Sequence, residues 1–418
     1  MHCVDEKEGR FRRGAKLAWP VSDADKAVGV KSEELIVAGD PWRVGVMFSQ
    51  TGVTAAVERT ALQGTVLAIE EINARGGVLD RLIEPVITDP ESIPTRYRST
   101  AERLMTSERV RLIFGCYMSS SRKVTIPAVE AFRGILFYPT LYEGFEYSPN
   151  CIYTGACPNQ NSLQLARYLL QVYGKRFLMI GSNYVYPYES NRIMTDLVVQ
   201  VGGKVLDEIY VPLDAGRRDF GKAIAQIEKL KPDVVFSTVV GRATAVFYEA
   251  YHDALGPTRP PIASLTTSEA EVADMRPEAA EGHITGAPFF ETLATPSAKR
   301  FVRDYKQRFG QDAPVSACAE AAYFQMHLAA RALRRTGTDD PDLLLRELRE
   351  SEFDAPQGRV RIDAENNHTF LWPRVARLDA AKNFQIVWNP GMRVKPDPYC
   401  VVQSLDDWSA DPLTATAS

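Results

Sequence analysis

Residues 110–139, VRLIFGCYMSSSRKVTIPAVEAFRGILFYP, place two apolar runs on either side of a helix-like segment. The runs VRLIFG (110–115) and ILFYP (135–139) predict buried strands, and the segment 122–133 between them predicts a helix. Two strands joined by a helix form a βαβ unit, in which both strands run parallel in one sheet. This stretch therefore predicts an α/β fold.

The same alternation of strand and helix signals extends over most of the chain. Further strands are predicted at 42–49, 83–89, 176–182, 204–213, 233–240 and 261–267. Further helices are predicted at 54–74, 95–106, 160–173, 188–201, 217–231 and 242–255. The series restarts near residue 155, so the sequence predicts two doubly wound units of similar length and order. Later helices at 296–309, 316–335 and 340–350 are followed by alternating strands within 360–368, 370–379 and 382–389.

The composition is that of an ordinary globular protein of 418 residues, long enough for two domains. A net charge of −4 argues against direct nucleic-acid binding, and no apolar run reaches the roughly 18 residues of a membrane helix. Residues 1–41 are polar and lack the apolar core of a signal peptide, so we expect a flexible extension and a cytoplasmic protein. The six cysteines form no CxxC pair, which favours buried reduced thiols over disulfides or a metal site.

Hydroxyl and tyrosine side chains gather directly after the predicted strands. The loops concerned are SQTGVT (49–54), CYMSSS (116–121), TLYEGFEYS (140–148), NYVYPYES (183–190) and SEAE (268–271). Ligands of open parallel sheets bind at the carboxyl ends of the strands, where these loops lie. Each single hydroxyl also has an alternative role as a helix N-cap. Taken together, the loops predict a site for a small polar molecule with both donor and acceptor atoms.

Catalytic motifs are absent from the sequence. Cys116 follows a strand without a nearby histidine and is expected to be a buried core thiol, and no GxSxG, Walker or GxGxxG motif occurs. The carboxylates of Glu143 and Glu146 could serve acid–base chemistry, but surface or capping roles are the favoured interpretation. The sequence therefore predicts a protein that is not an enzyme, without catalytic residues, metal ligands or a cofactor.

Several of these motifs resemble a known family of cytoplasmic amide receptors. The resemblance rests on VGVMFSQTGVTAAVERTALQGTVLAIEEINARGG, GCYMSSSRK, FYPTLYEGFEYSPN, CPNQNS, GSNYVYPYESN, PDVVFSTVVG and PPIASLTTSEAEVA, and it continues through DAPQGRVRIDAENNH to DPYCVVQSLDDWSA. Members of that family are negative regulators of an aliphatic amidase operon. They belong to the wider type 1 periplasmic-binding-protein fold, with branched-chain amino acid and urea binding proteins.

The resemblance implies two α/β lobes that are joined by three crossovers, near 155–160, 284–288 and 363–369. Lobe 1 would combine 42–155 with 287–365, and lobe 2 would combine 156–286 with 366–400. Residues 1–41 would form the N-terminal extension and 401–418 a C-terminal tail.

The resemblance also implies a set of ligand-binding residues between the lobes: Tyr117, Ser119, Tyr138, Thr140, Tyr186, Val240 and Thr267. Ser119 and Thr140 would hydrogen-bond a carboxamide, and Tyr117 and Tyr138 would shape the wall of the first lobe. Tyr186 would close over the ligand from the second lobe. The chain departs from the family pattern at Leu141, which adjoins Thr140 and bears on the acyl chain that fits.

Three functional hypotheses follow. The main one is a sensor that binds a small aliphatic amide such as acetamide and thereby releases a sequestered RNA-binding antiterminator protein. The alternative is the substrate-binding protein of an ABC transporter for amides, urea or branched-chain amino acids. The third, an amide hydrolase that uses Cys116, lacks the partner residues of a nucleophile. The oligomeric state is left open by the sequence, and self-association is one of the options.

Overall fold

The computed structural model of the chain describes residues 39–400. The predicted N-terminal extension over 1–41 lies outside the described residues except for its last three positions, and the predicted tail over 401–418 lies wholly outside them.

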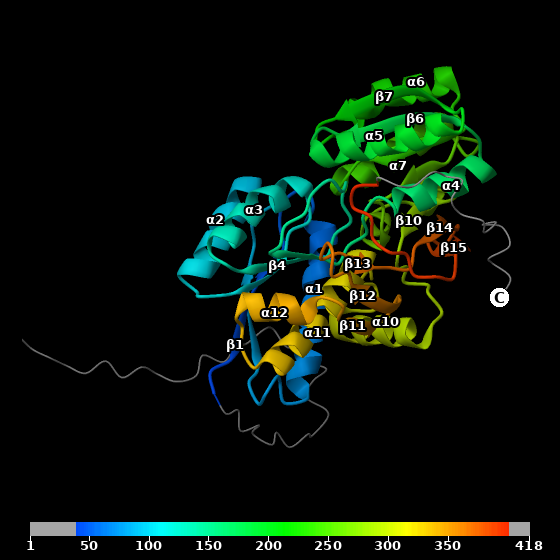
Figure 1. Cartoon of the computed structure of the whole chain (residues 1–418). Helices are drawn as coiled ribbons and strands as arrows, with labels where there is room; N and C mark the ends of the chain where they lie inside the picture. Colours follow the sequence, from blue (N-terminus) through cyan, green and yellow to red (C-terminus); the bar gives the residue numbers. More distant parts are fainter. Residues whose placement is uncertain (1–38, 401–418) are drawn as a thin grey trace, which may run out of the picture. The chain divides into compact units, whose positions relative to one another are not determined.

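The first sheet contains five parallel strands in the order β2-β1-β3-β4-β5. Strands β1 and β4 of this sheet are labelled in Figure 1. Its strands are β1 (Trp42–Met47), β2 (Ile83–Thr88), β3 (Leu112–Gly115), β4 (Ile135–Tyr138) and β5 (Cys151–Tyr153). The helices that follow them or cover the sheet are α1 (Ala55–Ala74), α2 (Pro94–Thr106), α3 (Ser119–Ala131), α10 (Pro296–Phe309), α11 (Ala317–Thr336) and α12 (Pro341–Leu348). We call this sheet and its helices the first lobe.

Strand β3 shows why the first sheet is buried on both faces. All four of its residues are buried. Because side chains alternate along a strand, Phe114 points to the core under α1 and α11, whereas Ile113 points to the core under α2 and α3. Phe114 stacks on Phe137 of β4 with ring centroids 4.6 Å apart. The apolar runs of the opening stretch therefore form central strands of the sheet, as the sequence predicts.

The second sheet contains seven strands in the order β15-β14-β10-β9-β8-β6-β7. Its strands are β6 (Arg176–Ser182), β7 (Lys204–Val211), β8 (Val234–Thr238), β9 (Ile262–Ser264), β10 (Ile284–Ala287), β14 (Arg374–Leu378) and β15 (Phe384–Trp388). Its helices are α4 (Ser162–Val172), α5 (Val185–Gln200), η2 (Arg217–Phe220), α6 (Gly221–Leu230), α7 (Arg242–Leu255), α8 (Glu269–Ala273) and α9 (Pro277–Ala280). Strands β14 and β15 pair antiparallel, in keeping with their alternating sequence pattern. We call this sheet and its helices the second lobe.

The chain passes between the two sheets three times. It leaves the first after β5, returns after β10, and leaves again after β13 (Thr369–Phe370). β13 belongs to a small three-stranded sheet with β11 (Glu352–Ala355) and β12 (Gly358–Ile362). The third passage therefore follows residue 370; the resemblance implied a crossover near 363–369. This arrangement is the type 1 periplasmic-binding-protein fold, with two α/β lobes joined by three crossovers.

Element limits differ from the sequence-based prediction mainly at helix ends. Helix α3 begins at Ser119 rather than at 122, because Ser121 and Arg122 already donate backbone hydrogen bonds to the Met118 carbonyl. The predicted helix over 217–231 divides into the 3₁₀ turn η2 and α6. The short helices α8 and α9 had no counterpart in the prediction. Between residues 39 and 400 no helix is both long and apolar enough to cross a membrane.

Both lobes share one strand order, in which the second strand along the chain lies outside the first. The order reverses between β1 and β3 in the first lobe and between β6 and β8 in the second. Such reversal points create the crevice in which doubly wound folds bind ligands. The loops after β3, β4, β6, β8 and β9 are therefore the place to look for a site.

Candidate ligand-binding site

A cavity lies among these loops, with walls from both lobes. It is lined by Tyr117, Ser119, Thr140, Leu141, Tyr184, Tyr186, Val240 and Thr266. The space open to the centres of water-sized groups is only ≈ 10 Å³, enough for about one such group. Five of the seven predicted ligand-binding residues line this cavity, and no charged side chain from the described part of the chain does. We call it the central cavity.

A second, more apolar cavity of ≈ 40 Å³ adjoins the central one. The two share Tyr117, Leu141 and Thr266. Thr267, the sixth predicted ligand-binding residue, lines only this neighbouring cavity. Its hydroxyl lies 2.9 Å from that of Tyr248, and its carbonyl accepts a hydrogen bond from Thr285, so its polar groups are already engaged. The structure thus separates Thr267 from the residues of the central cavity.

Ser119 is the first residue of helix α3 and its hydroxyl is part of a buried polar network. It donates a hydrogen bond to Oε2 of Glu143, and it accepts one from Nη1 of Arg122 at 3.2 Å. Glu143 and Arg122 are both buried. The expected surface or capping role of Glu143 is therefore wrong, because this carboxylate is held under the cavity wall by Ser119 and Arg122.

Arg122 joins Glu143 to a second carboxylate, that of Glu146. Its Nη2 lies 3.1 Å from Oε1 of Glu143, and its Nε lies 2.7 Å from Oε1 of Glu146. Lys123 lies 3.0 Å from Oε2 of Glu146. Burial lowers the pKa of Arg122, but the surrounding charges, those of Glu143 and Glu146 included, raise this pKa well above its usual value. The network balances two cations against two anions, of which Arg122 and Glu143 are buried and therefore need paired charges, whereas Lys123 is exposed.

Aromatic rings pack behind this network. The guanidinium of Arg122 lies over the rings of Tyr138 and Tyr142, at 4.9 and 4.5 Å from their centroids. His368 stacks on Tyr153 at 4.1 Å, and burial lowers its pKa to about 3, so that the ring is neutral at pH 7. These rings hold Arg122 in one position without touching the cavity.

Tyr138, predicted to shape the cavity wall, lies one layer behind it. Its ring is fully buried in this aromatic group, and its hydroxyl donates to the Tyr117 carbonyl at 2.7 Å. Tyr138 therefore fixes the backbone of Tyr117, which does line the cavity. Tyr138 itself is not part of the cavity lining, so the structure places it in a supporting position.

The second lobe contributes two tyrosines from the start of helix α5. Tyr184 and Tyr186 lie with ring centroids 6.2 Å apart, and Tyr184 packs against the core of the first lobe. The Tyr186 hydroxyl is buried and makes no hydrogen bond of acceptable geometry within residues 39–400. Burial raises the pKa of Tyr186, and the nearby Ser190 hydroxyl lowers it in part. A buried hydroxyl without a partner is rare in proteins, so this group is available to a ligand.

Val240 and Thr266 complete the wall of the second lobe. The backbone N–H of Val240 donates to Oγ of Ser182 at 3.2 Å, so only its apolar side chain faces the cavity. The Thr266 hydroxyl donates to the Val239 carbonyl at 2.9 Å, which leaves its oxygen as an acceptor. The second lobe thus offers the tyrosine hydroxyls of Tyr184 and Tyr186, together with apolar and accepting surface.

The first polar loop does not reach the central cavity, contrary to the prediction from the sequence. Its residues surround the buried carboxyl of Glu58, which accepts from the Ser49 backbone N–H at 2.7 Å, the Thr54 hydroxyl at 2.6 Å and the Tyr97 hydroxyl at 2.5 Å. Burial raises the pKa of Glu58 from 4.5 to about 7. The hydroxyls after β1 therefore satisfy an internal group rather than a ligand.

Cys116 is buried, as the sequence predicts for a core thiol. Burial raises its pKa to about 12, so the reactive thiolate is not populated near neutral pH. Cys116 adopts φ = 68°, and this left-handed backbone turns the chain from β3 toward Tyr117 and Ser119. Its role is thus to shape the loop.

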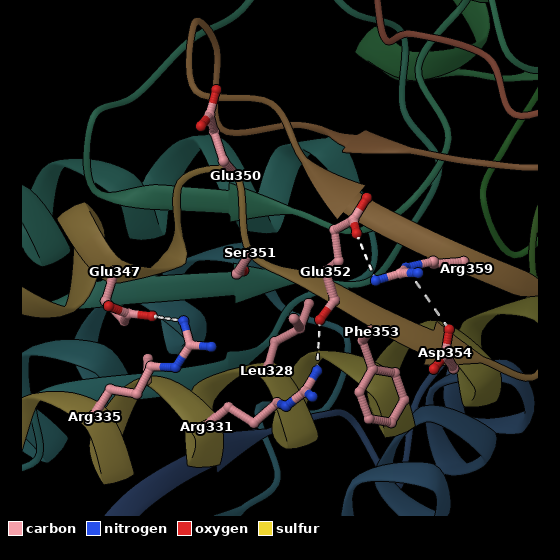
Figure 2. A pocket seen from close by; sticks show the side chains of 11 residues that line it. Leu328, Arg331, Arg335, Glu347, Glu350, Ser351, Glu352, Phe353, Asp354 and Arg359 are labelled. Atoms are coloured by element: carbon pink, nitrogen blue, oxygen red, sulfur yellow. Dashed lines mark hydrogen bonds and ion pairs between the residues drawn. The ribbon is translucent and has the colours of Figure 1, made fainter.

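Two larger hollows lie elsewhere, on the surface of the first lobe. One of ≈ 290 Å³ is lined by residues of α11, α12 and β11 (Figure 2), and one of ≈ 340 Å³ shares Phe353 and Asp354 with it. In Figure 2, Arg335 points at Glu347, and Arg359 lies between Glu352 and Asp354. Because these charges pair with one another, the first hollow presents no converging set of free groups to a ligand.

Three features of the site escaped the sequence analysis. Tyr184 and Thr266 lie beside residues that were predicted, within loops already singled out by their position after strands. The pairing of Arg122 with Glu143 was not foreseen, because it joins the start of α3 to the loop after β4. The burial of Arg122, three positions after Ser119, would indicate a buried partner for its charge. That burial is known only once the buried face of α3 is known.

Fold and site together define a two-lobed protein with a small uncharged cavity between its lobes and, among the described residues, no catalytic constellation at that cavity. Residues 42–405 match the sequence model of the family described as periplasmic binding protein domain, and the chain belongs to this family.

Two of the named relatives that match most of the chain are binding proteins. A Leu/Ile/Val-binding protein homolog of Brucella melitensis is 24% identical over 298 residues, which cover 69% of this chain and 75% of the relative. A leucine-, isoleucine-, valine-, threonine- and alanine-binding protein of Pseudomonas aeruginosa is 23% identical over 345 residues, which cover 79% of this chain and 88% of the relative.

Solved structures show the same fold. A solute binding protein of an ABC transporter from Rhodopseudomonas palustris, in complex with p-hydroxybenzoic acid, superposes with a TM-score of 0.78 at 20% identity. The match covers 87% of this chain and 99% of that one. The substrate binding protein of a branched-chain amino acid transporter from Streptococcus pneumoniae, in complex with isoleucine, gives a TM-score of 0.75 at 18% identity, covering 83% and 99% of the two chains.

Proposed function

We propose that the chain is a solute-binding protein of the kind that serves ABC transporters, and that its solute is a small uncharged amide. The family and the names of the relatives support a binding protein of a transporter over the regulator that the motif resemblance suggested. The single observation that supports the solute class is the central cavity, whose lining among the described residues is polar but uncharged.

Among the described residues, the cavity lining holds no cationic side chain that could pair with a carboxylate ligand. p-Hydroxybenzoic acid and isoleucine, the ligands of the two solved relatives above, both carry a carboxyl group. A buried carboxylate needs a cation or several hydrogen-bond donors. Arg122, the cation nearest Ser119, is already enclosed by Glu143 and Glu146. A neutral solute avoids the cost of burying an unpaired charge.

The size of the cavity limits the affinity. A solute of four heavy atoms gains at most about 1.5 kcal/mol per atom, or about 6 kcal/mol in total, which corresponds to a Kd of about 40 μM. Any solute larger than one water-sized group requires the lobes to separate further than the ≈ 10 Å³ cavity allows. A short aliphatic amide such as acetamide requires less separation than leucine does.

A thermal-shift screen tests this proposal. The probes are acetamide, propionamide, butyramide, urea, leucine and benzoate, each at a concentration of about 4 mM, which is roughly 100 times the Kd expected for acetamide. At 100 times its Kd a solute stabilises the folded chain by about 2.7 kcal/mol, which raises the Tm of a chain of this size by about 4 °C. The proposal predicts this rise for a short amide and none for leucine or benzoate. A rise with leucine or benzoate alone contradicts it.

A second candidate function uses the same site. The extended motif resemblance favours a cytoplasmic amide sensor, which would hold an RNA-binding antiterminator protein and release it when amide binds. The sensor and the transporter protein predict the same solute binding. An experiment with the antiterminator partner distinguishes the two functions. An amide that binds tightly yet leaves a complex with such a partner unchanged rules the sensor out.

A further inference from the structure

We propose that Glu143, which does not line the central cavity, fixes the hydrogen-bond polarity of the site by holding the Ser119 hydroxyl as an acceptor. The solute must then present an N–H or O–H donor to Ser119. This inference rests on the proposed function, because it assumes that the solute occupies the central cavity.

The first step is the charge state of Glu143. Arg122 and Lys123 supply two positive charges to the network, and Glu143 and Glu146 are its two carboxyl groups. Arg122 is fully buried and cannot lose its charge. The four charges sum to zero only when both carboxyl groups are ionised, and the buried Arg122 cation lies 3.1 Å from the buried Glu143 carboxylate. An ionised carboxylate has no proton to donate, so Ser119 is the donor in the Ser119–Glu143 hydrogen bond.

The second step counts the hydrogen bonds that the Ser119 hydroxyl donates and accepts. A hydroxyl has one proton and two acceptor positions. Its proton goes to Glu143, and one acceptor position receives the N–H of Arg122. One acceptor position is left, and Ser119 lines the cavity. Toward a solute, therefore, Ser119 can only accept.

Rotation of the Ser119 hydroxyl toward the solute would not change this result. It would leave Oε2 of the buried Glu143 carboxylate without its donor. Leaving a buried charged acceptor unsatisfied costs more than a typical hydrogen bond contributes. Glu143 thus holds the proton of Ser119 against competition from the solute.

The opposite wall has the complementary property. The Tyr186 hydroxyl is buried, lacks a partner among residues 39–400 and lines the same cavity. It can donate to a carbonyl oxygen, while Ser119 accepts from a donor. An amide carries one group of each kind, whereas acetate places lone pairs against the Ser119 oxygen, and acetone brings a methyl group to it.

The first experiment uses the unaltered full-length chain and two neutral probes of equal shape. Calorimetric titration with acetamide and with acetone should show acetamide binding at least ~10-fold more tightly, because acetone lacks the donor. Equal affinity for the two overturns the inference and leaves the proposed binding site standing. Absence of acetamide binding overturns the proposed function, and this inference with it.

The second experiment changes the polarity of Ser119. In Glu143→Gln the amide N–H₂ can donate to the Ser119 oxygen, which frees the Ser119 proton for the solute. We expect the ratio of acetamide to acetate affinity to fall at least ~10-fold. Glu146→Gln is the matched control, because it removes the same charge from Arg122 without touching Ser119. A fall of the same size in both variants, or in neither, overturns the inference.

Discussion

Gly241 of the second lobe lies against Val53 of the first, so closely that a Cβ atom at position 241 would stand 2.2 Å from the Val53 carbonyl oxygen. The neighbouring backbone N–H of Arg242 donates to that same oxygen at 3.0 Å. Gly241 directly follows Val240, which lines the central cavity. A backbone contact between the lobes therefore adjoins the solute site, and only glycine permits it.

We predict that Gly241→Ala weakens solute binding about 10-fold or more, because the added methyl group forces Val53 away and holds the lobes apart. The variant also strains the backbone, since φ = 62° with ψ = −149° is a region that costs other residues about 1–3 kcal/mol. Titration of acetamide into the variant measures the loss of binding.

Gly256→Ala is the control that separates the clash with Val53 from the strain of a positive φ angle. Gly256 ends the same helix with nearly the same backbone angles, φ = 69° and ψ = −164°, but no atom lies within 4 Å of its added Cβ. Both variants should lose stability in urea unfolding, and only Gly241→Ala should lose affinity. Equal affinities would show that the Gly241–Val53 contact does not control closure.

Removing the Ser119 hydroxyl should weaken both binding and folding. Ser119→Ala takes away the acceptor that faces the cavity and the donor that satisfies Glu143. We expect acetamide affinity to fall by about 10- to 100-fold, or about 1.4–2.8 kcal/mol, and stability to fall by about 1–3 kcal/mol. Calorimetry and urea unfolding check the two effects. Ser120→Ala, one residue further along α3 and outside the cavity lining, should change neither by more than a few tenths of a kcal/mol.

Leu141 should set the length of the acyl chain. It lines both the central cavity and the apolar cavity next to it, so its removal joins the two. In Leu141→Ala each methylene added beyond acetamide should gain up to about 0.8 kcal/mol, a factor of about four, as it fills the space. Titrations with acetamide, propionamide and butyramide give the slope, which is the change in binding free energy per added methylene. Leu343→Ala changes an exposed leucine and serves as the control. Its slope should equal that of the unaltered chain. An unchanged slope in Leu141→Ala would place the acyl chain elsewhere.

The buried carboxyl of Glu58 should make stability depend on pH. Its pKa is about 7 in the folded chain, against 4.5 for the same carboxyl group exposed to water, so the folded state binds this proton more tightly. The contribution of the protonated Glu58 carboxyl group to the stability of the fold is fully present below pH 4.5. It is lost as the pH rises through 7. Glu58→Gln stays neutral, so it should gain about 3 kcal/mol relative to the unaltered chain between about pH 4.5 and about pH 8.

Urea unfolding of the unaltered chain and of Glu58→Gln, at about pH 4.5 and at about pH 8, measures this difference in stability. Glu228→Gln, on the exposed face of α6, serves as the control for replacing a carboxyl group by an amide. A difference between Glu58→Gln and the unaltered chain that does not change with pH would contradict the burial of Glu58.

The βαβ alternation was readable from the sequence because central parallel strands are buried on both faces. Runs such as LIFG in β3 are therefore continuously apolar and stand out between helices. The place of the site followed as well, since doubly wound sheets bind ligands at their carboxyl edge. Seven positions came from family resemblance, and five of them line the central cavity.

What the sequence could not show depends on burial and on contacts between distant loops. Polar residues after β1 look the same as those after β3, although the former surround Glu58 and the latter face the cavity. Tyr138 was placed on the wall, but its side chain points one layer deeper, because alternation along β4 turns it away. The Arg122–Glu143 pair joins residues 21 positions apart, and no local pattern announces it.

The most direct test of the central claim is calorimetric titration of the full-length chain with acetamide and, separately, with leucine. A small uncharged cavity predicts one acetamide per chain with a Kd no lower than about 40 μM and no heat from leucine. Tight leucine binding without acetamide binding would contradict it, and would show that the lobes open to a larger, charged solute.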